Sequence, residues 1–456
     1  MYKRYMIQKN FQLFIFRRDF RIQDNTALDA LHEFPEPIIP VFIFAPDQID
    51  PTKNPYFSNN CVQFMCESLC DLEKNIEAKG GRMNFFHGDT IAILEKLLKI
   101  SKYKIVRIGV NQDYTPYSRA RDDKIEALCK KHGVEFLSRE DICIQPIGSV
   151  KTGSGTIYKK YTPYYNKAKE LPIRKPIGRT SYNFAKLQVS PKNSSGLLTK
   201  FYKKNPNLLH PGGRENALRQ LAHLPADYQK TRNTPSIPTT ELSAYNKFGC
   251  ISIRELMAKL DKDISRELYF RDFYYNIIYY YPYILGGAFE KKWDKIKWDK
   301  PIPKILTAFY EGRTGFPIID AGIRQMTTTG FMHNRVRMLV ASFFTKDLLY
   351  DWRIGERFFA NNLYDYDPTQ NNCGWQVVAG FGPSALDWFR VMNPWLQTEK
   401  FDPDCTYIKE WVPELSKYMA KQIINQDWNA KDYPRPIVNH EEAKKKMMAA
   451  YKSVTL

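Results

Sequence analysis

The chain has 456 residues, of which 26% are charged and 43% are hydrophobic, and no stretch approaches the roughly 18 consecutive apolar residues of a membrane-spanning helix. This length predicts two or three globular domains. The apolar run at residues 11–16 is too short for the core of a secretion signal. Eight scattered cysteines include no C-x-x-C pair, which argues against a disulfide framework and a structural zinc site. We therefore expect a protein that stays inside the cell, in the cytoplasm or nucleus, and binds no metal.

The charge is strongly positive. Sixty-eight lysines and arginines face 49 aspartates and glutamates, which leaves a net charge of +19. Such an excess predicts polyanionic partners, and nucleic acid backbones are the commonest of these; a lysine-rich surface without such a role is the alternative. All eight tryptophans lie between residues 293 and 428, so the chain has two chemically distinct parts.

The first 140 residues alternate short apolar runs with amphipathic stretches. Near-continuous apolar runs are typical of strands in a parallel sheet that is covered on both faces. The predicted strands are 11–16, 38–44, 83–88 and 104–110, and the predicted helices include 61–81 and 118–133. We therefore expect an α/β domain with a doubly wound parallel sheet over residues 1–140. Neither G-x-G-x-x-G nor G-x-x-x-x-G-K-[ST] occurs, so the usual phosphate-binding loops are absent.

Two further regions follow this domain. Residues 141–210 are rich in basic side chains and are predicted to form a linker between domains, partly helical around 161–170. The charge of this linker fits either DNA binding or simple solvation. From residue 211 helical periodicity dominates, so we expect an all-α domain over residues 211–456. Its predicted helices are 215–224, 252–262, 301–312, 317–330, 333–350 and 355–364.

Three segments place polar residues where a helical core would not tolerate them unpaired. The hydroxyls of TTELS (239–243) either cap a helix start or hold a phosphate group. In MHNRVRM (332–338), two arginines and an amide enter an apolar helix and need acidic partners or a ligand. NLYDYDPTQNNCGWQ (362–376) supplies two carboxylates in a turn that starts another helix. A buried Arg337–Asp365 ion pair is the interpretation that these residue types favour.

A series of longer motifs identifies a family. The chain opens with FIFRRDFRIQDNTALDAL and continues with GRTGFPIIDAGIRQM (312–326), MHNRVRMLVASFFTKDLLYDWRIGERFF (332–359) and DYDPTQNNCGWQ (365–376). It then carries FRVMNPWLQTEKFDPDCTYIKEWVPEL (389–415) and DYPRPIVNHEEA (432–443). With these motifs in this order, the chain resembles the photolyase/cryptochrome family, specifically its class I cyclobutane pyrimidine dimer photolyases, over nearly its whole length.

The resemblance implies that the helical domain binds FAD. Tyr228 and the TTELS residues would hold the phosphates, and Asn371 would face the flavin N5 atom, where an amide favours the reduced flavin. The implied cofactor-binding residues are Tyr228, Thr239, Thr240, Leu242, Ser243, Arg271, Asn334, Arg337, Asp365, Asp367 and Asn371. The family's chain of electron-transferring tryptophans is matched by Trp298, Trp352 and Trp375.

The resemblance also implies a lesion pocket beside the flavin. The implied catalytic residues are Glu267, Asn334 and Asn371, and the implied DNA- and lesion-binding residues are Arg232, Glu267, Phe270, Arg335, Met338, Val377 and Arg390. Phe270 and Val377 stand where class I enzymes carry tryptophan, and a lost stacking surface is worth about 1–3 kcal/mol per base. Phe381 and Trp388 are the neighbouring aromatic residues that could replace it.

The expected function is the light-driven repair of cyclobutane pyrimidine dimers in DNA by electron transfer from reduced FAD, carried out by a monomeric lyase. A cryptochrome-like blue-light photoreceptor without repair activity and a (6–4) photolyase stay open as alternatives. The (6–4) enzymes carry a pair of histidines where this chain has His333 and Arg337. The chain ends 13 residues after DYPRPIVNHEEA, so we expect no long signalling tail.

A flavin-free basic nucleic-acid-binding protein is a further alternative, but it would leave Asp365, Asp367 and the TTELS segment unexplained. The family often carries an antenna chromophore in its N-terminal domain, either a folate or 8-hydroxy-5-deazaflavin. Residues 111–123 are a candidate wall of its pocket. The sequence does not distinguish between these pigments.

Overall fold

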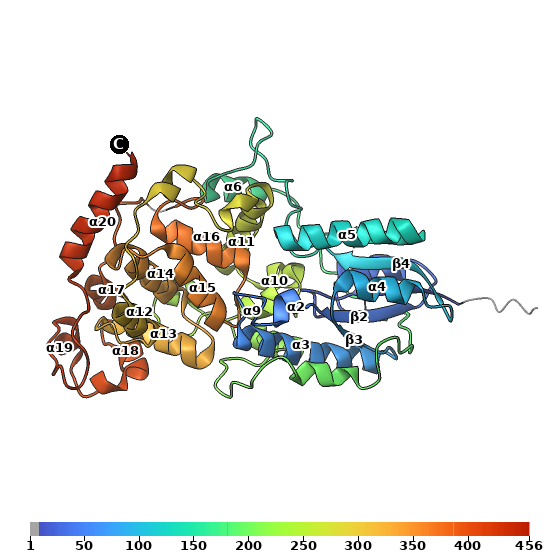
Figure 1. Ribbon diagram of the computed structural model, residues 1–456, viewed down its shortest axis with the longest axis horizontal. Coiled ribbons are helices and arrows are strands. Elements are labelled where there is room, and N and C mark those ends of the chain that lie inside the picture. Colours follow the sequence, from blue (N-terminus) through green and yellow to red (C-terminus); the bar gives the residue numbers. More distant parts are fainter. Residues whose placement is uncertain (1–8, 180, 386, 456) are drawn as a thin grey trace, which may run out of the picture.

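The computed structural model describes residues 9–179, 181–385 and 387–455, and its N-terminal part is a five-stranded sheet (Figure 1). The strand order is β3-β2-β1-β4-β5, and every neighbouring pair is parallel. The strands are β1 (Asn10–Ile15), β2 (Ile38–Phe44), β3 (Asn84–His87), β4 (Lys104–Asn111) and β5 (Glu135–Arg139). The strand order reverses between β1 and β4, which is where doubly wound sheets place their ligands.

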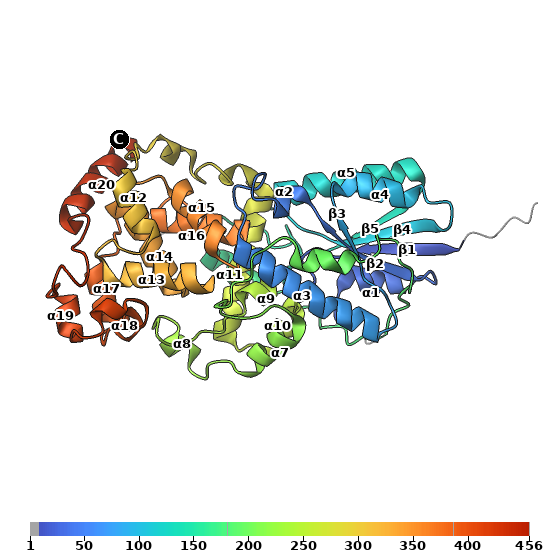
Figure 2. The same cartoon turned by 60° about the horizontal axis from the view of Figure 1, so that its bottom comes forward.

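Helices cover both faces of this sheet (Figure 2). Successive residues of β1 point to opposite faces, so Leu13 packs with Leu94 in one core, whereas Phe14 packs with Leu31 and Leu69 in another. The helices of this part are α1 (Thr26–His32), α2 (Pro46–Ile49), α3 (Asn59–Ala78), α4 (Thr90–Leu98) and α5 (Pro116–His132). The predicted doubly wound α/β fold is therefore confirmed.

Four of the five strands and both predicted helices of this part lie where the sequence places them. Helix α5 ends at Gly133, whose φ of 64° is the left-handed conformation that glycine adopts without strain. Strand β5 was not predicted, because its sequence EFLSR contains only two apolar residues. It pairs with β4 over its whole length, so tertiary pairing rather than local pattern determines it.

The basic segment 141–210 packs against both halves of the molecule. Helix α6 (Tyr161–Ala168) lies against α11 (Lys262–Tyr280), where Tyr161 shares a core with Phe273. Farther along, Phe184 forms an isolated bridge with Ile38 of β2. The 3-10 turn η1 (Ser194–Thr199) contacts β3. The segment therefore runs along the edge of the sheet after it leaves the helical half.

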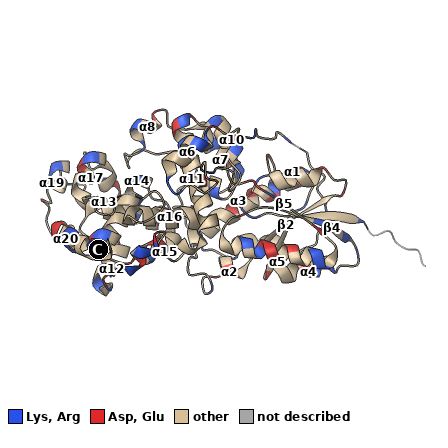
Figure 3. Cartoon of the chain, turned by 90° about the horizontal axis from the view of Figure 1, so that it is seen from above, with Lys and Arg blue, Asp and Glu red and all other residues tan. Residues whose placement is uncertain are grey.

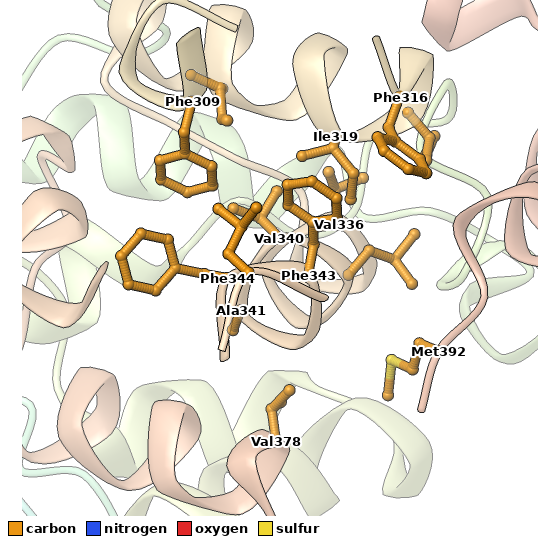
Figure 4. Close-up of a cluster of buried hydrophobic side chains, with 14 of the residues drawn as sticks. Phe309, Phe316, Ile319, Val336, Val340, Ala341, Phe343, Phe344, Val378 and Met392 are labelled. Atoms are coloured by element: carbon orange, nitrogen blue, oxygen red, sulfur yellow. The ribbon is translucent and has the colours of Figure 1, made fainter. Parts of the chain in front are cut away.

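The rest of the chain is helical, as predicted, and its core surrounds α13 and α14, where Ile319, Val336 and Phe343 converge (Figure 4). Gly322 lets these helices approach closely, because a Cβ there would lie 2.3 Å from Cγ1 of Val336. The α-helices are α7 (Arg214–Ala222), α8 (Tyr228–Thr231), α9 (Ser243–Lys247), α10 (Ile253–Lys259), α11 (Lys262–Tyr280), α12 (Pro303–Tyr310), α13 (Pro317–Thr329), α14 (Asn334–Ser342), α15 (Trp352–Asn362), α16 (Pro368–Ala379), α17 (Pro394–Phe401), α18 (Thr406–Trp411), α19 (Ala420–Ile424) and α20 (His440–Thr455). The 3-10 turns are η2 (Pro282–Ile284), η3 (Lys291–Lys295) and η5 (Pro413–Leu415).

Two helical features differ from the sequence prediction. Helix α11 was not predicted, because residues 272–278 are buried on every side and show no amphipathic period. The predicted helix 333–350 is divided into α14 and a π-helical turn, η4 (Phe343–Asp347), and such turns occur frequently at functional sites. Across the described ranges, none of the helices combines the length and apolar character needed to cross a membrane.

Candidate functional site

A cavity of about 510 Å³, which we call the helical cavity, opens between helices α8–α11 and helices α14–α16. The predicted site residues that line it are Tyr228, Arg232, Thr240, Leu242, Ser243, Glu267, Phe270, Arg271, Asn334, Arg337, Met338, Asp365, Asp367, Asn371, Trp375 and Val377. The predicted residues outside its lining are Thr239, Trp298, Arg335, Trp352 and Arg390. Folding therefore gathers residues from separate motifs around one space.

The predicted Arg337–Asp365 ion pair is confirmed. Nη2 of Arg337 lies 2.8 Å from Oδ2 of Asp365, and the Ser243 hydroxyl donates to the same oxygen at 2.6 Å. The other carboxylate oxygen, Oδ1, is buried and has no hydrogen-bond partner among the described residues. Asp365 is thus fixed by two donors and keeps one acceptor for a ligand.

Asp367 is held from both sides. Its Oδ1 accepts hydrogen bonds from the backbone N–H groups of Thr369 and Gln370 and so caps α16. Its Oδ2 accepts from the Tyr275 hydroxyl at 2.7 Å and pairs with Arg18. Burial alone would raise the pKa of Asp367, but Arg18 and Tyr275 outweigh it and hold the pKa well below its usual range. Asp367 is therefore a buried anion at neutral pH.

Asn371 has its amide nitrogen occupied by Glu356. Nδ2 of Asn371 donates to Oε1 of Glu356 at 2.9 Å and to its backbone oxygen at 3.0 Å. Of the two polar atoms of the Asn371 side chain, the amide oxygen is the one that stays available to a ligand. Burial raises the pKa of Glu356 to about 7, although the hydrogen bond from Asn371 opposes this shift. Sequence reasoning missed Glu356, which lies in an ordinary amphipathic helix, α15.

The TTELS segment contributes individual side chains to the cavity lining rather than a cap for a helix. Helix α9, which it precedes, has only five residues and receives no side-chain cap at its first turn. Ser243 turns instead to Asp365, and Glu241 pairs with His210 at 2.6 Å. The helix-capping interpretation of these hydroxyls is therefore wrong. Thr240, Leu242 and Ser243 face the cavity, while Thr239 does not line it.

At the mouth of the cavity, Glu267 and Arg232 form an ion pair. Nη1 of Arg232 lies 2.8 Å from Oε1 of Glu267, and both side chains are partly exposed. Phe270 is the nearby aromatic wall, and it rests on Tyr161 and Tyr274 with ring centroids 4.2 and 4.9 Å apart. This mouth can present a carboxylate, a guanidinium and an apolar ring to an incoming group.

The other candidate aromatic residues point elsewhere. Phe381 packs on Trp293 and Trp352, and Trp388 packs on Trp293 and Tyr451. Neither Phe381 nor Trp388 lines the helical cavity. The structure therefore offers no replacement from these two residues for a tryptophan at position 377.

Two predicted DNA contacts lie outside the cavity. Arg335 donates to Oδ1 of Asn233 at 2.6 Å and lies over the ring of Phe401. Arg390 is exposed, and its backbone oxygen accepts a hydrogen bond of 2.6 Å from the buried Lys346 in the π-helical turn. Sequence reasoning missed Lys346. Both arginines are available to an extended partner rather than to a small ligand.

The three predicted tryptophans differ in burial and in whether they line the cavity. Trp375 lines it, Trp352 is buried outside its lining, and Trp298 is half-buried against Tyr451. Gly355 makes room for Trp375, because a Cβ there would lie 2.2 Å from Cη2 of the indole. The indole N–H of Trp375 is buried without a hydrogen-bond partner in the described part of the chain. Of the three, Trp375 alone lines the cavity, and the electron-transfer role of the set stays a prediction.

A second cavity, of about 490 Å³, lies at the carboxyl ends of the strands, and we call it the sheet cavity. Asp113, Thr115, Tyr117 and Arg121 line it, so part of segment 111–123 forms one of its walls. The helical half contributes Glu356 and Tyr366, among other residues. Its place at the reversal of strand order is where such sheets bind ligands.

The groups around the helical cavity fit a flavin dinucleotide. Its volume is in the usual range for ligand pockets, roughly 300–1,000 Å³. Oδ1 of Asp365 and the Trp375 indole N–H leave one unused acceptor and one unused donor, and the Asn371 oxygen adds an acceptor. These unpaired atoms can form hydrogen bonds with a ring edge on which donors and acceptors alternate. The flavin ring of FAD has such an edge.

Comparison with known proteins agrees with this chemistry. Residues 264–453 match the family described as the FAD binding domain of DNA photolyase, and residues 12–179 match the family described as DNA photolyase. The chain belongs to the DNA photolyase family. Its helical half therefore carries the FAD-binding domain of a photolyase, with FAD as the cofactor.

Photolyases similar to this chain span its whole length. The deoxyribodipyrimidine photo-lyase of Alkalihalophilus pseudofirmus is 33% identical over 96% of this chain and 97% of that protein. The archaeal photolyase of Sulfolobus tokodaii, a structure with two FAD molecules, superposes with a TM-score of 0.87 at 39% identity and covers 97% of this chain and 100% of that one. A class III photolyase from Agrobacterium tumefaciens gives a TM-score of 0.88 at 30% identity, with both chains covered completely.

Proposed function

We propose that this photolyase repairs cyclobutane pyrimidine dimers in DNA under light. The observation that carries this proposal is the helical cavity, which combines fixed carboxylates and an amide inside with a carboxylate, a guanidinium and an aromatic ring at its mouth. Relatives that match over their whole length are named deoxyribodipyrimidine photo-lyase. Assignment to class I rests on the sequence motifs.

When bound and reduced, FAD supplies the light-absorbing electron donor. The chain's own residues bind and orient it: Asp365, Asp367 and Asn371 present oxygens along the wall of the cavity, and Arg337 keeps Asp365 in place. Thr240 and Ser243 supply hydroxyls near one end, while Tyr228 and Arg271 complete the set of polar contacts. Trp375, Trp352 and Trp298 form the route by which electrons from the surface reach the cavity.

The lesion enters at the mouth, and it must leave the DNA stack because the cavity does not admit a duplex. Glu267 accepts hydrogen bonds from the damaged bases once Arg232 turns from it to a phosphate group. Phe270 and Met338 provide apolar contact, and the exposed Asn334 adds an amide to the lining. Val377 leaves this wall without the indole of class I enzymes, so Phe270 carries the stacking.

The DNA itself spreads over the basic surface around the mouth. Arg335 and Arg390 flank the cavity, and lysines and arginines are distributed over both halves of the molecule (Figure 3). Neutralised phosphates release counterions, so we expect affinity for damaged DNA to fall steeply with salt. The protein acts as a monomer and works where the cell keeps its DNA, in the cytoplasm or nucleus.

The sheet cavity is the site of a light-harvesting chromophore. Its volume and its position beside the helical cavity support this role. The Sulfolobus tokodaii photolyase is described with two FAD molecules and the implication of a novel light-harvesting cofactor. A folate, a deazaflavin and FAD are the candidate pigments. Adding each to the protein and recording excitation spectra of FAD fluorescence identifies the one that transfers energy.

One assay tests the repair function. Purified reduced protein is illuminated with an oligonucleotide that carries a cyclobutane dimer, in parallel with a (6–4) substrate and with dark controls. We expect restoration of the cyclobutane substrate only, and only in light. A protein that holds FAD but repairs neither substrate is a photoreceptor of the cryptochrome type, and a colourless protein that rejects added FAD overturns the proposal.

A further inference from the structure

The loop after β1 brings a side chain of the α/β half to a carboxylate that lines the helical cavity. Nε of Arg18 donates to the backbone oxygen of Lys247 at 3.1 Å, and Nη2 donates to the Tyr275 hydroxyl at 2.7 Å. The same guanidinium forms an ion pair with Asp367, and its Nη1 lies 3.6 Å from Asp113. Arg18 and Asp367 are 349 residues apart in the sequence.

The backbone that carries Arg18 is fixed against the helical half. Gly249, with a φ of +62°, lies directly over it, because a Cβ there would sit 2.3 Å from the backbone oxygen of Arg18. The N–H of Phe20 donates to the backbone oxygen of Phe248 at 3.0 Å, and the two rings stack 5.8 Å apart. The guanidinium of Arg18 therefore extends from a rigid anchor rather than from a free loop.

Arg18 also stands between the two cavities. It lines the sheet cavity, whereas its partner Asp367 lines the helical cavity. Asp367 needs fixed donors on both oxygens if it is to present one geometry to a ligand, and Arg18 is the only one of its donors that comes from the α/β half among the described residues. The other charged groups around this carboxylate are Arg271 from α11 and, behind Arg18, Asp113.

We propose that Arg18 is a positioning residue for the flavin site: it orients the Asp367 carboxylate toward the cofactor, so that FAD retention depends on a side chain of the α/β half. This inference rests on the proposed function, in which Asp367 contacts FAD. Arg18 itself touches no reacting atom. Its contribution is to hold a buried anion in one orientation with a charge-assisted bond.

The test compares variants of the full-length protein by FAD titration. Arg18→Met removes the charge and the donors, and we expect the dissociation constant for FAD to rise roughly 10- to 100-fold, as for a lost hydrogen bond to a charged group. Arg18→Lys restores the charge and should recover part of the affinity. Tyr275→Phe removes the other side-chain donor to Oδ2 of Asp367 and should give a smaller loss.

Arg107→Met is the matched control. Arg107 is a buried arginine of the same half, with a side-chain exposure of 10% against 14% for Arg18, and its ion pairs are with Glu36 and Glu135 of that half. It lines neither cavity. We expect Arg107→Met to leave the FAD dissociation constant within twofold of the wild type. Arg107 has no contact with Asp367, so removing its guanidinium leaves that carboxylate in place.

A pH profile distinguishes positioning from a merely structural role. In Arg18→Met the Asp367 carboxylate takes up a proton more easily, so FAD should be released at a higher pH on acidification than in wild type or Arg107→Met. Equal FAD affinity and equal release pH in the Arg18→Met and Arg107→Met variants would overturn the inference and leave the proposed function standing. Wild-type protein that fails to bind FAD would overturn both, whereas FAD binding without repair would overturn only the repair function.

Discussion

The two cavities are close in volume but differ in how their polar groups are fixed. In the helical cavity each of the three predicted carboxylates is bound to an arginine from another element. The pairs are Asp365 with Arg337, Asp367 with Arg18 and, at the mouth, Glu267 with Arg232. In the sheet cavity, Arg17 and Arg121 pair with Asp122, which does not itself line that cavity. Asp113, which does line it, has among the described residues only a longer ion-pair contact of 3.6 Å with Arg18. Fixed acceptors suit a cofactor whose ring edge must be held in one orientation. A pigment that only absorbs light needs fewer fixed polar contacts.

The cavities share one wall, so they are not independent. Lys247 and Tyr366 line both of them, and Glu356 lines the sheet cavity while it binds Asn371 of the helical cavity. Substitutions can therefore show whether a change in one cavity alters ligand binding in that cavity alone or also in the other. The four changes below are ordered by expected size.

Arg337→Ala should have the largest effect. It leaves the buried Asp365 with only Ser243 as a donor, and unpairing a buried charge costs on the order of 3–5 kcal/mol. We expect FAD affinity to fall at least about 100-fold in a fluorescence titration. Arg353→Ala, a partly exposed arginine of α15, is the control and should bind FAD as the wild type does. Tight FAD binding by Arg337→Ala would show that the helical cavity is not the flavin site.

Glu267→Ala should lower repair without affecting the cofactor. Glu267 lies at the mouth, and a hydrogen bond to a charged group is worth about 1.5–3 kcal/mol, so we expect repair per absorbed photon to fall about tenfold. The absorption spectrum of bound FAD should not change. Glu215→Ala, on the exposed face of α7, is the control for loss of a surface carboxylate. Unchanged repair in Glu267→Ala would mean that the lesion binds somewhere other than at this mouth.

Glu356→Gln should change the pH dependence of stability. The folded protein keeps a proton on Glu356 up to a pKa of about 7, whereas the unfolded chain releases it near 4.5, so stability contributed by this group is lost as the pH rises through that interval. The variant avoids burying this charge. It should be more stable than wild type by about 1–3 kcal/mol at pH 8 and equal to it at about pH 4.

Urea unfolding at the two pH values measures this difference. The exposed Glu311→Gln is the control and should follow the wild type at both pH values. If Glu356→Gln is no more stable than wild type at pH 8, the carboxyl group is already ionised and solvated in the folded protein, and the wall between the cavities is wetter than the structure indicates.

Ala45→Trp should have the smallest effect. Ala45 is buried at the carboxyl end of β2, so the larger side chain fills part of the sheet cavity and excludes a pigment. Repair in dim light should fall toward that of protein without pigment, while repair in saturating light stays unchanged. Repair assays at several light intensities, with and without added pigment, measure both. A loss of repair in saturating light would mean that the substitution reaches the helical cavity through the shared wall.

Most of the fold was accessible from local sequence. Strands β1 to β4 are apolar runs that can only be buried, and α5 ends at a glycine whose conformation favours that end. Strand β5 and helix α11 were not predicted, because β5 is too polar for a buried strand and α11 is too buried for an amphipathic helix. In both elements tertiary contacts override the local pattern.

The candidate site divides in the same way. The Arg337–Asp365 pair follows from residue types, since two arginines in an apolar helix require acidic partners. The contact of Ser243 with Asp365 contradicts the capping interpretation, because the hydroxyl finds a carboxylate that is distant in sequence. The sequence did not indicate that Glu356 and Lys346 are buried. An acid in an amphipathic helix and a lysine in a polar stretch of a motif both ordinarily face solvent.

By itself the sequence determined the two-part fold, the family and most of the polar residues that line the helical cavity. Strand burial, helix periodicity and motif order are all properties of neighbouring residues. Only the tertiary structure decided which groups complete that set. Arg18 reaches Asp367 across 349 residues, and Phe270 rests on Tyr161 from the basic segment. Such contacts depend on how the two halves pack, and packing is a property of the whole chain rather than of any window in it.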